Sequence, residues 1–208
     1  MITEQQINFD NYFKRNYFKT PKDVLTYYIR AVIGGTIGCI GILTDNFLFK
    51  GSGILISPFG TPFSSFIYSL YKMNPRFIFH FIHILISGLI FVGIGYGCGK
   101  LANEFNDIHD NFGFYIEDRE LTPREKREKY ISHFVVTFAL GFLLFNSLII
   151  TDTSMIIGVG LTTSILLPLI NCGLQMSVNN INNIKTYFNV FLINFTGLSI
   201  SSLLTLMI

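Results

Sequence analysis

Apolar runs of about twenty residues, separated by short polar breaks, fill most of the chain from residue 24 to its C-terminus. A helix of that length crosses the roughly 30 Å hydrocarbon core of a bilayer. Half of the 208 residues are hydrophobic and only 13% are charged, which is more apolar surface than one soluble domain can bury. The sequence therefore predicts an all-α, polytopic integral membrane protein, whose first partner is the lipid bilayer.

The charge and motif pattern excludes several other classes of protein. A formal net charge of +2 is too small to indicate nucleic-acid binding, and the basic residues lie in loops instead of along one face. The histidines, cysteines and serines lack the spacing of a nucleophile, a zinc protease or a phosphate-binding loop. We therefore expect no nucleic acid, no enzymatic activity, no metal site and no cofactor, and we interpret the three cysteines as small packed residues.

Two aspartates are the main candidates for function. After residue 24, Asp45 and Asp152 are the only acidic side chains outside the polar stretch 100–129. Each follows a threonine at the end of an apolar run. An acid at membrane depth costs roughly 2.5–3.5 kcal/mol, which makes a functional role the default hypothesis. The alternative is that each acid caps a helix end in the headgroup region, and their symmetric placement fits both interpretations.

Glycine and proline interrupt the apolar run that follows each aspartate. The run at 47–71 contains three glycines together with Pro58 and Pro62, and the run after Asp152 contains Pro168. Proline leaves a backbone carbonyl without its donor, and in lipid that carbonyl needs protein or a water-filled cavity as partner. Broken helices of this kind mark binding sites in many transporters, although proline also kinks purely structural helices.

A shift of 107 residues places the first half of the chain on the second. It aligns Thr44-Asp45 with Thr151-Asp152, and it also aligns Gly51 with Gly158, Gly53 with Gly160 and Ser57 with Ser164. The common order predicts two copies of a three-helix unit, about six transmembrane helices in all, with the second helix of each repeat broken by Gly/Pro. Three crossings per copy give an inverted-topology repeat. If the broken segments re-enter instead of crossing, the repeats are parallel.

The predicted boundaries follow from the polar segments. Residues 1–20 form an interfacial or flexible N-terminal segment, 21–99 the first repeat, 100–122 a polar connecting loop and 123–208 the second repeat. Thr20-Pro21 and Thr122-Pro123 carry helix-start patterns, and the fourth and sixth spans are expected from about residues 130 and 186. The Lys and Arg counts of the two sides tie, so the first helix alone favours a cytoplasmic N-terminus.

Several motifs carry a family resemblance. The stretch Leu43-Thr44-Asp45, then Gly53-Ile54-Leu55-Ile56-Ser57-Pro58 and Pro62, resembles the first motif of a hydrophobic membrane family catalogued as domain of unknown function 389. The stretches Leu167-Pro168-Leu169 and Leu192-Ile193-Asn194-Phe195-Thr196-Gly197 are similar to its later motifs. The resemblance covers about residues 24–208. It implies a shared membrane fold and no particular activity.

Two functions are consistent with these patterns. The first is a transporter or channel for a small ion or solute at the repeat interface, with a site formed by Asp45, Asp152, Ser57, Pro58, Pro62, Pro168, Asn171 and Asn194. The alternative is a non-transporting structural or assembly protein that forms a homo-oligomer. An oligomer would bury the stripe Gly34/Gly38/Gly41 or the glycines of 93–99 between copies, whereas a self-contained transporter would bury them internally. We interpret His80 and His83, which share a helix face, as packing residues rather than as a metal or proton site.

Overall fold

The computed structural model describes residues 20–104, 116, 119–149 and 154–208, so the predictions for Asp152 and for residues 1–19 lie outside the described residues. In this part of the chain every regular element is a helix. The helices are α2 (Pro21–Leu43), α3 (Phe47–Ile56), α4 (Gly60–Tyr71), α5 (Phe77–Glu104), α7 (Pro123–Ile149), α8 (Ser154–Ser177) and α9 (Ile181–Met207).

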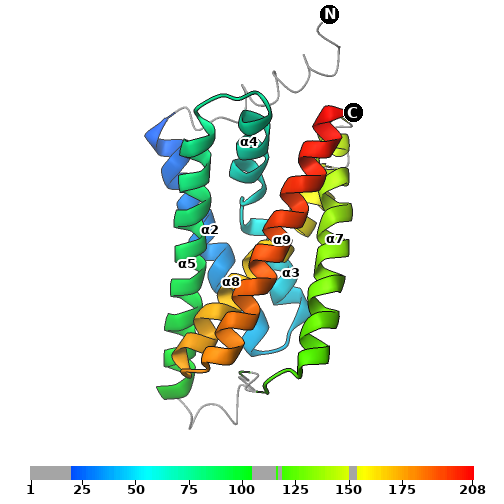
Figure 1. Cartoon of the computed structure of the whole chain (residues 1–208). Helices are drawn as coiled ribbons and strands as arrows, with labels where there is room; N and C mark the ends of the chain where they lie inside the picture. Colours follow the sequence, from blue (N-terminus) through cyan, green and yellow to red (C-terminus); the bar gives the residue numbers. More distant parts are fainter. Residues whose placement is uncertain (1–19, 105–115, 117–118, 150–153) are drawn as a thin grey trace, which may run out of the picture.

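The helices lie side by side along one axis (Figure 1). From the end of the bundle where the chain terminates, α2 runs to the far end, α3 and α4 return one after the other, and α5 runs to the far end again. In the second half the directions are opposite: α7 starts at the far end, α8 returns to it, and α9 leads back to the C-terminus. The two-repeat relation itself stays a prediction, as does the count of six crossings.

Three of these helices are long and apolar enough to cross a membrane: α2 with 23 residues, α5 with 28 and α9 with 27. Their outward positions carry apolar side chains, such as Leu25 with 61% and Leu89 with 72% of its surface exposed. Exposing such an apolar surface to water costs free energy, whereas exposing it to the hydrocarbon of a bilayer does not. The helices are therefore those of a membrane protein.

The two sequence patterns that predicted helix starts form the expected N-terminal caps. Thr20 Oγ1 accepts a hydrogen bond from Asp23 N at 3.2 Å, Asp23 Oδ2 accepts one from Thr20 N at 2.9 Å, and α2 ends at Leu43 as expected. The same reciprocal pair joins Thr122 and Glu125, so α7 begins at Pro123, earlier than the predicted span near residue 130. Likewise α9 begins at residue 181, five residues before the predicted start of the sixth span.

The predicted break in the second span is present. Ser57 precedes a proline and adopts an extended backbone with φ −72° and ψ 119°, because the proline ring disfavours the helical region for the residue before it. Pro62 falls in the first turn of α4, where no intrahelical donor is needed. The matching break predicted for the fifth run is wrong, because α8 continues through Pro168. One proline removes a single helical hydrogen bond, and the packing of α8 against α5 and α9 maintains the helix across it.

Three pairs of helices cross so closely that only glycine fits. A Cβ atom built on Gly53 of α3 would lie 2.4 Å from Gly38 N of α2, and one on Gly173 of α8 would lie 2.1 Å from the Val92 carbonyl oxygen of α5. A Cβ on Gly141 of α7 would lie 2.7 Å from the Leu198 carbonyl oxygen of α9. These contacts are with backbone, so the helices would have to separate to admit a side chain.

The two glycine stripes singled out in the sequence are used differently. Gly34, Gly38 and Gly41 are buried inside the chain against α3 and α8, and Gly95 and Gly99 are buried against α8. Gly93 and Gly97, by contrast, face open space, with no atom within 4 Å of a Cβ added there. Most of these glycines therefore pack against other helices of the same chain.

Candidate functional site

Within the described part of the chain, two cavities are lined by side chains of α2, α3, α7, α8 and α9, of the α2–α3 turn and of the segment before α7. The first cavity has a volume of about 450 Å³ and lies between α7, α8 and α9. Its polar lining comes from Lys129, Ser132, His133, Asn171 and Tyr187, and its apolar lining from Val136, Leu167, Pro168 and Val190.

The second cavity, of about 470 Å³, lies next to the first. Leu167, Asn171 and Tyr187 line both cavities, so the two adjoin along one wall. The other polar groups of the second cavity come from the α2–α3 turn, from α3, from the segment before α7 and from α8, and they are Asp45, Lys50, Arg119 and Gln175 respectively. The site thus draws on both halves of the sequence.

Asp45 sits at the exposed rim of the second cavity. Its side chain is 92% exposed and accepts a hydrogen bond from Lys50 Nζ at 2.5 Å. This hydrogen bond and the charge of Lys50 hold the pKa of the Asp45 carboxyl below its ordinary value. The predicted position between two helices is confirmed, but the cap of α3 is the neighbouring Asn46, which accepts from Leu48 N and Phe49 N.

Polar contacts tie the segment before α7 to α8 and α9. Asn183 Nδ2 donates to the Arg119 carbonyl oxygen and to Gln175 Oε1, both at 3.3 Å. Arg119 also forms an ion pair with Glu125, whose pKa is lowered chiefly by hydrogen bonds from Thr122 and further by Arg119. These contacts hold Arg119 in place, and Arg119 forms part of the wall of the second cavity.

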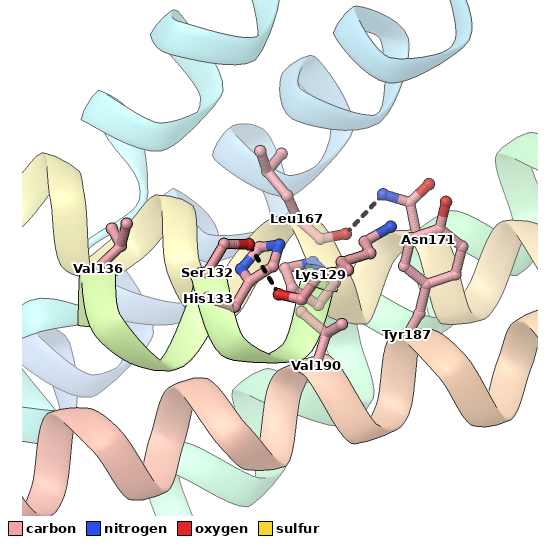
Figure 2. A pocket seen from close by; sticks show the side chains of 9 residues that line it. Lys129, Ser132, His133, Val136, Leu167, Asn171, Tyr187 and Val190 are labelled. Carbon is pink, nitrogen blue, oxygen red and sulfur yellow. Dashed lines mark hydrogen bonds between the residues drawn. The ribbon is translucent and has the colours of Figure 1, made fainter. Parts of the chain in front are cut away.

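Figure 2 shows the first cavity from close by, with Lys129, Asn171 and Tyr187 gathered at one end. The Lys129 ammonium lies 4.5 Å from the centroid of the Tyr187 ring, a cation–π distance. Asn171 Nδ2 donates to the Leu167 carbonyl oxygen at 3.0 Å, which orients the amide oxygen the other way. The cavity therefore presents a cation, an amide and an aromatic hydroxyl together.

A buried contact supports the other end of the first cavity. His133 Nδ1 lies 3.4 Å from Nδ2 of Asn194, a residue with 0% exposure. His133 lines the cavity, whereas Asn194 is not one of the lining residues and contacts His133 from behind. Asn194 therefore positions the ring.

The structure brings together only some of the predicted site residues. Asp45, Pro168 and Asn171 line the cavities, and Asn194 stands behind His133. The residues of the helix break, which are Ser57, Pro58 and Pro62, are not part of either lining. Ser57 is 5% exposed, and within the described part of the chain its hydroxyl oxygen has no hydrogen-bond partner.

Several lining residues were missed by the sequence interpretation. Lys129, His133, Gln175 and Tyr187 line the cavities but were not predicted as site residues. Lys129 belongs to a basic stretch that is typical of a solvated loop. The available signal is its spacing of four from His133, which places both side chains on one face of α7.

His80 and His83 are buried on α5, away from both cavities. His83 Nδ1 forms a 2.5 Å hydrogen bond with the Tyr28 hydroxyl of α2, and next to it the Tyr27 hydroxyl lies 2.7 Å from Ser87 Oγ. These bonds join α2 to α5, in keeping with a packing role. Among the described residues no three His, Cys, Asp or Glu side chains come together as metal ligands.

Comparison with known proteins assigns the family. No curated protein and no solved structure matches the chain. The family model described as "Domain of unknown function (DUF389)" matches residues 54–200, well over half of the chain, and includes the motifs at Pro58, Pro168 and Asn194. The protein therefore belongs to the DUF389 family, as those motifs indicated.

Proposed function

We propose that this protein carries a small solute or ion across a membrane and binds it in the two adjoining cavities. The observation that carries the proposal is the pair of cavities, about 450 and 470 Å³, that meet at Asn171 and Tyr187 in a bundle with three helices long and apolar enough to cross a membrane. Volumes of this size accommodate a small molecule. Polar and ionisable groups are expensive within a membrane bundle, and a solute pathway is a common reason for their presence.

The helix break supports a change of conformation around these cavities. Lys50 lies on α3 and lines the second cavity, while the chain between α3 and α4 is extended at Ser57. A hinge at this break lets α3 move without α4 and changes the wall that Lys50 provides. In this proposal the hydroxyl of Ser57 and the rings of Pro58 and Pro62 belong to the hinge, not to the solute contacts.

A homo-oligomer is the second candidate function, and one observation favours it. Gly93 and Gly97 form an open strip on α5, flanked by Leu89 with 72% and Tyr96 with 45% exposure. Such a strip allows close approach of a helix from another copy. The buried glycines of α2, which an assembly protein would keep for its interface, support the transporter instead.

Flux measurements in liposomes test the proposal. Purified protein would be reconstituted and offered radiolabelled cations, anions and small organic solutes, with protein-free liposomes as the blank. We expect uptake by the wild type and a strong loss in Asn171→Leu, since this change removes the amide shared by both cavities. Asn189→Leu is the matched control, because Asn189 is exposed on α9 outside both linings. Equal uptake by both variants would contradict the site.

The same flux assay also tests the two aspartates, Asp45 and Asp152. The double variant Asp45→Asn/Asp152→Asn tests whether the two aspartates take part in transport, as their alignment in the predicted repeat suggests. We expect lost uptake, with insertion intact and detergent stability nearly so, since the exposed Asp45–Lys50 pair contributes little. Full uptake in the double variant would restrict the site to the other residues of the cavities and leave Asp45 as a surface partner of Lys50.

A further inference from the structure

The charges that line the cavities are mostly positive. Within the described part of the chain, the linings contain three basic side chains, Lys50, Arg119 and Lys129, and one carboxylate, Asp45. That carboxylate is exposed at the rim and pairs with Lys50. A binding site for a metal cation such as Ca²⁺ or Mg²⁺ would need carboxylates or several carbonyl oxygens directed into the cavity. The charged side chains that line the two cavities instead carry a net positive charge.

In the first cavity the positive charge comes from Lys129. Among the described residues that line it, Lys129 is the one side chain with a fixed charge, and Figure 2 shows it beside Asn171 and Tyr187 at the wall that both cavities share. Lys129 is only partly exposed, so its charge attracts an anion more strongly than a fully solvated charge would. An ammonium can donate up to three hydrogen bonds.

The remaining walls of the first cavity are apolar. Val136 on α7, Leu167 and Pro168 on α8 and Val190 on α9 provide hydrocarbon opposite the polar groups. A cavity with one cationic end and aliphatic walls is complementary to a molecule with one negative group and a short alkyl part. A bare inorganic anion would leave the aliphatic walls without a partner.

From this juxtaposition we propose that the transported solute is a small monocarboxylate, whose carboxylate binds Lys129 and whose alkyl group lies against Leu167 and Val190. The inference rests on the proposed transport function and deepens it by naming the class of solute. His133, held by Asn194, and the Tyr187 hydroxyl are the neutral polar groups next to the carboxylate.

Uptake of [¹⁴C]pyruvate into reconstituted liposomes tests the assignment, beside ⁸⁶Rb⁺ and ³⁶Cl⁻ under the same gradient. We expect pyruvate uptake to exceed that of both ions. Lys129→Gln should reduce it on the order of tenfold, the effect of losing one charged hydrogen bond, and Lys129→Arg should restore most of it. Lys126→Gln is the matched control, because Lys126 is three residues earlier on α7 and outside both linings.

Three results of the uptake experiment would contradict different parts of the proposal. Rubidium or chloride uptake that exceeds pyruvate uptake and is lost in Asn171→Leu would overturn the monocarboxylate but keep the transport function. Pyruvate uptake that is equal in Lys129→Gln, Lys126→Gln and the wild type would overturn the role of Lys129, provided that all three proteins are monodisperse. No uptake of any probe above the protein-free blank would overturn the transport function and this assignment together.

Discussion

The crossing of α5 and α8 makes a quantitative prediction about stability. A Cβ atom on Gly95 would lie 2.2 Å from the Ile170 carbonyl oxygen and 3.1 Å from the Gly173 Cα atom. An ordinary carbon–oxygen contact is about 3.3 Å or longer, so alanine at this position forces the two helices apart by about 1 Å. Overpacking of this kind typically costs about 1–3 kcal/mol, and the better helix propensity of alanine returns at most about 1 kcal/mol.

Gly93 provides an internal control on the same helix. Its added Cβ would meet no atom within 4 Å, so Gly93→Ala gains only the helix propensity, up to about 1 kcal/mol. We therefore expect Gly95→Ala to be less stable and Gly93→Ala equally or more stable than the wild type. Unfolding by sodium dodecyl sulfate in mixed micelles, followed by circular dichroism, measures both free energies.

The double variant Gly95→Ala/Gly173→Ala sharpens this experiment. Since the first alanine already separates the helices, the second should cost less than it does alone, and the two changes should not be additive. If Gly95→Ala proves as stable as Gly93→Ala, the close crossing of α5 and α8 is refuted. Because α8 carries Asn171, the position of the cavities would then be in error as well.

Three further predictions address other parts of the chain. Lys50 lowers the Asp45 pKa in the folded protein, so the contribution of this pair to stability is fully present above the unfolded pKa of about 4 and is lost as the pH falls below that value and through the lower pKa of the folded state. Scanning calorimetry at about pH 7 and about pH 3 should show the advantage of the wild type over Asp45→Asn shrinking at the lower pH, and a difference independent of pH would contradict the pair. Thr122→Ala removes the cap of α7 and should cost about 0.5–2 kcal/mol in the same micelle assay, whereas an unchanged free energy would argue against the cap. Pro58→Ala restores a backbone donor and should join α3 to α4 and impair uptake; full uptake with a demonstrably continuous helix would rule out the hinge.

The local features of the fold were predictable because their signals are local. The Thr20 cap and the first-turn proline set the start of α2, and the threonine at position 122 does the same for α7. The break at Ser57 follows from its neighbour Pro58, which restricts the backbone before it. Such signals depend on a few consecutive residues, so no knowledge of the packing is needed to interpret them.

The candidate site was less predictable because tertiary packing assembles it. Lys129, Asn171 and Tyr187 come from three helices and are adjacent only because of how those helices pack. For the same reason the sequence suggested a break at Pro168 that the structure lacks, since neighbouring helices stabilise a helix across a single proline. The sequence singled out Asp45 as a candidate, whereas its exposure and its pairing with Lys50 follow from the geometry of the α2–α3 turn.

The distribution of close crossings explains where the cavities form. Glycines bring α5 against α8 and α7 against α9 at backbone contact, whereas His133 of α7 and Leu167 of α8 line the cavity that lies between these two helices and α9. Helices joined by backbone contact move together, because any separation breaks many contacts at once. The first cavity lies between these two pairs, so motion of one pair against the other changes its walls while leaving the glycine crossings intact. In the proposed transport cycle this is the movement that the bundle permits, and it acts on the side chains of Lys129 and Asn171, which belong to different pairs.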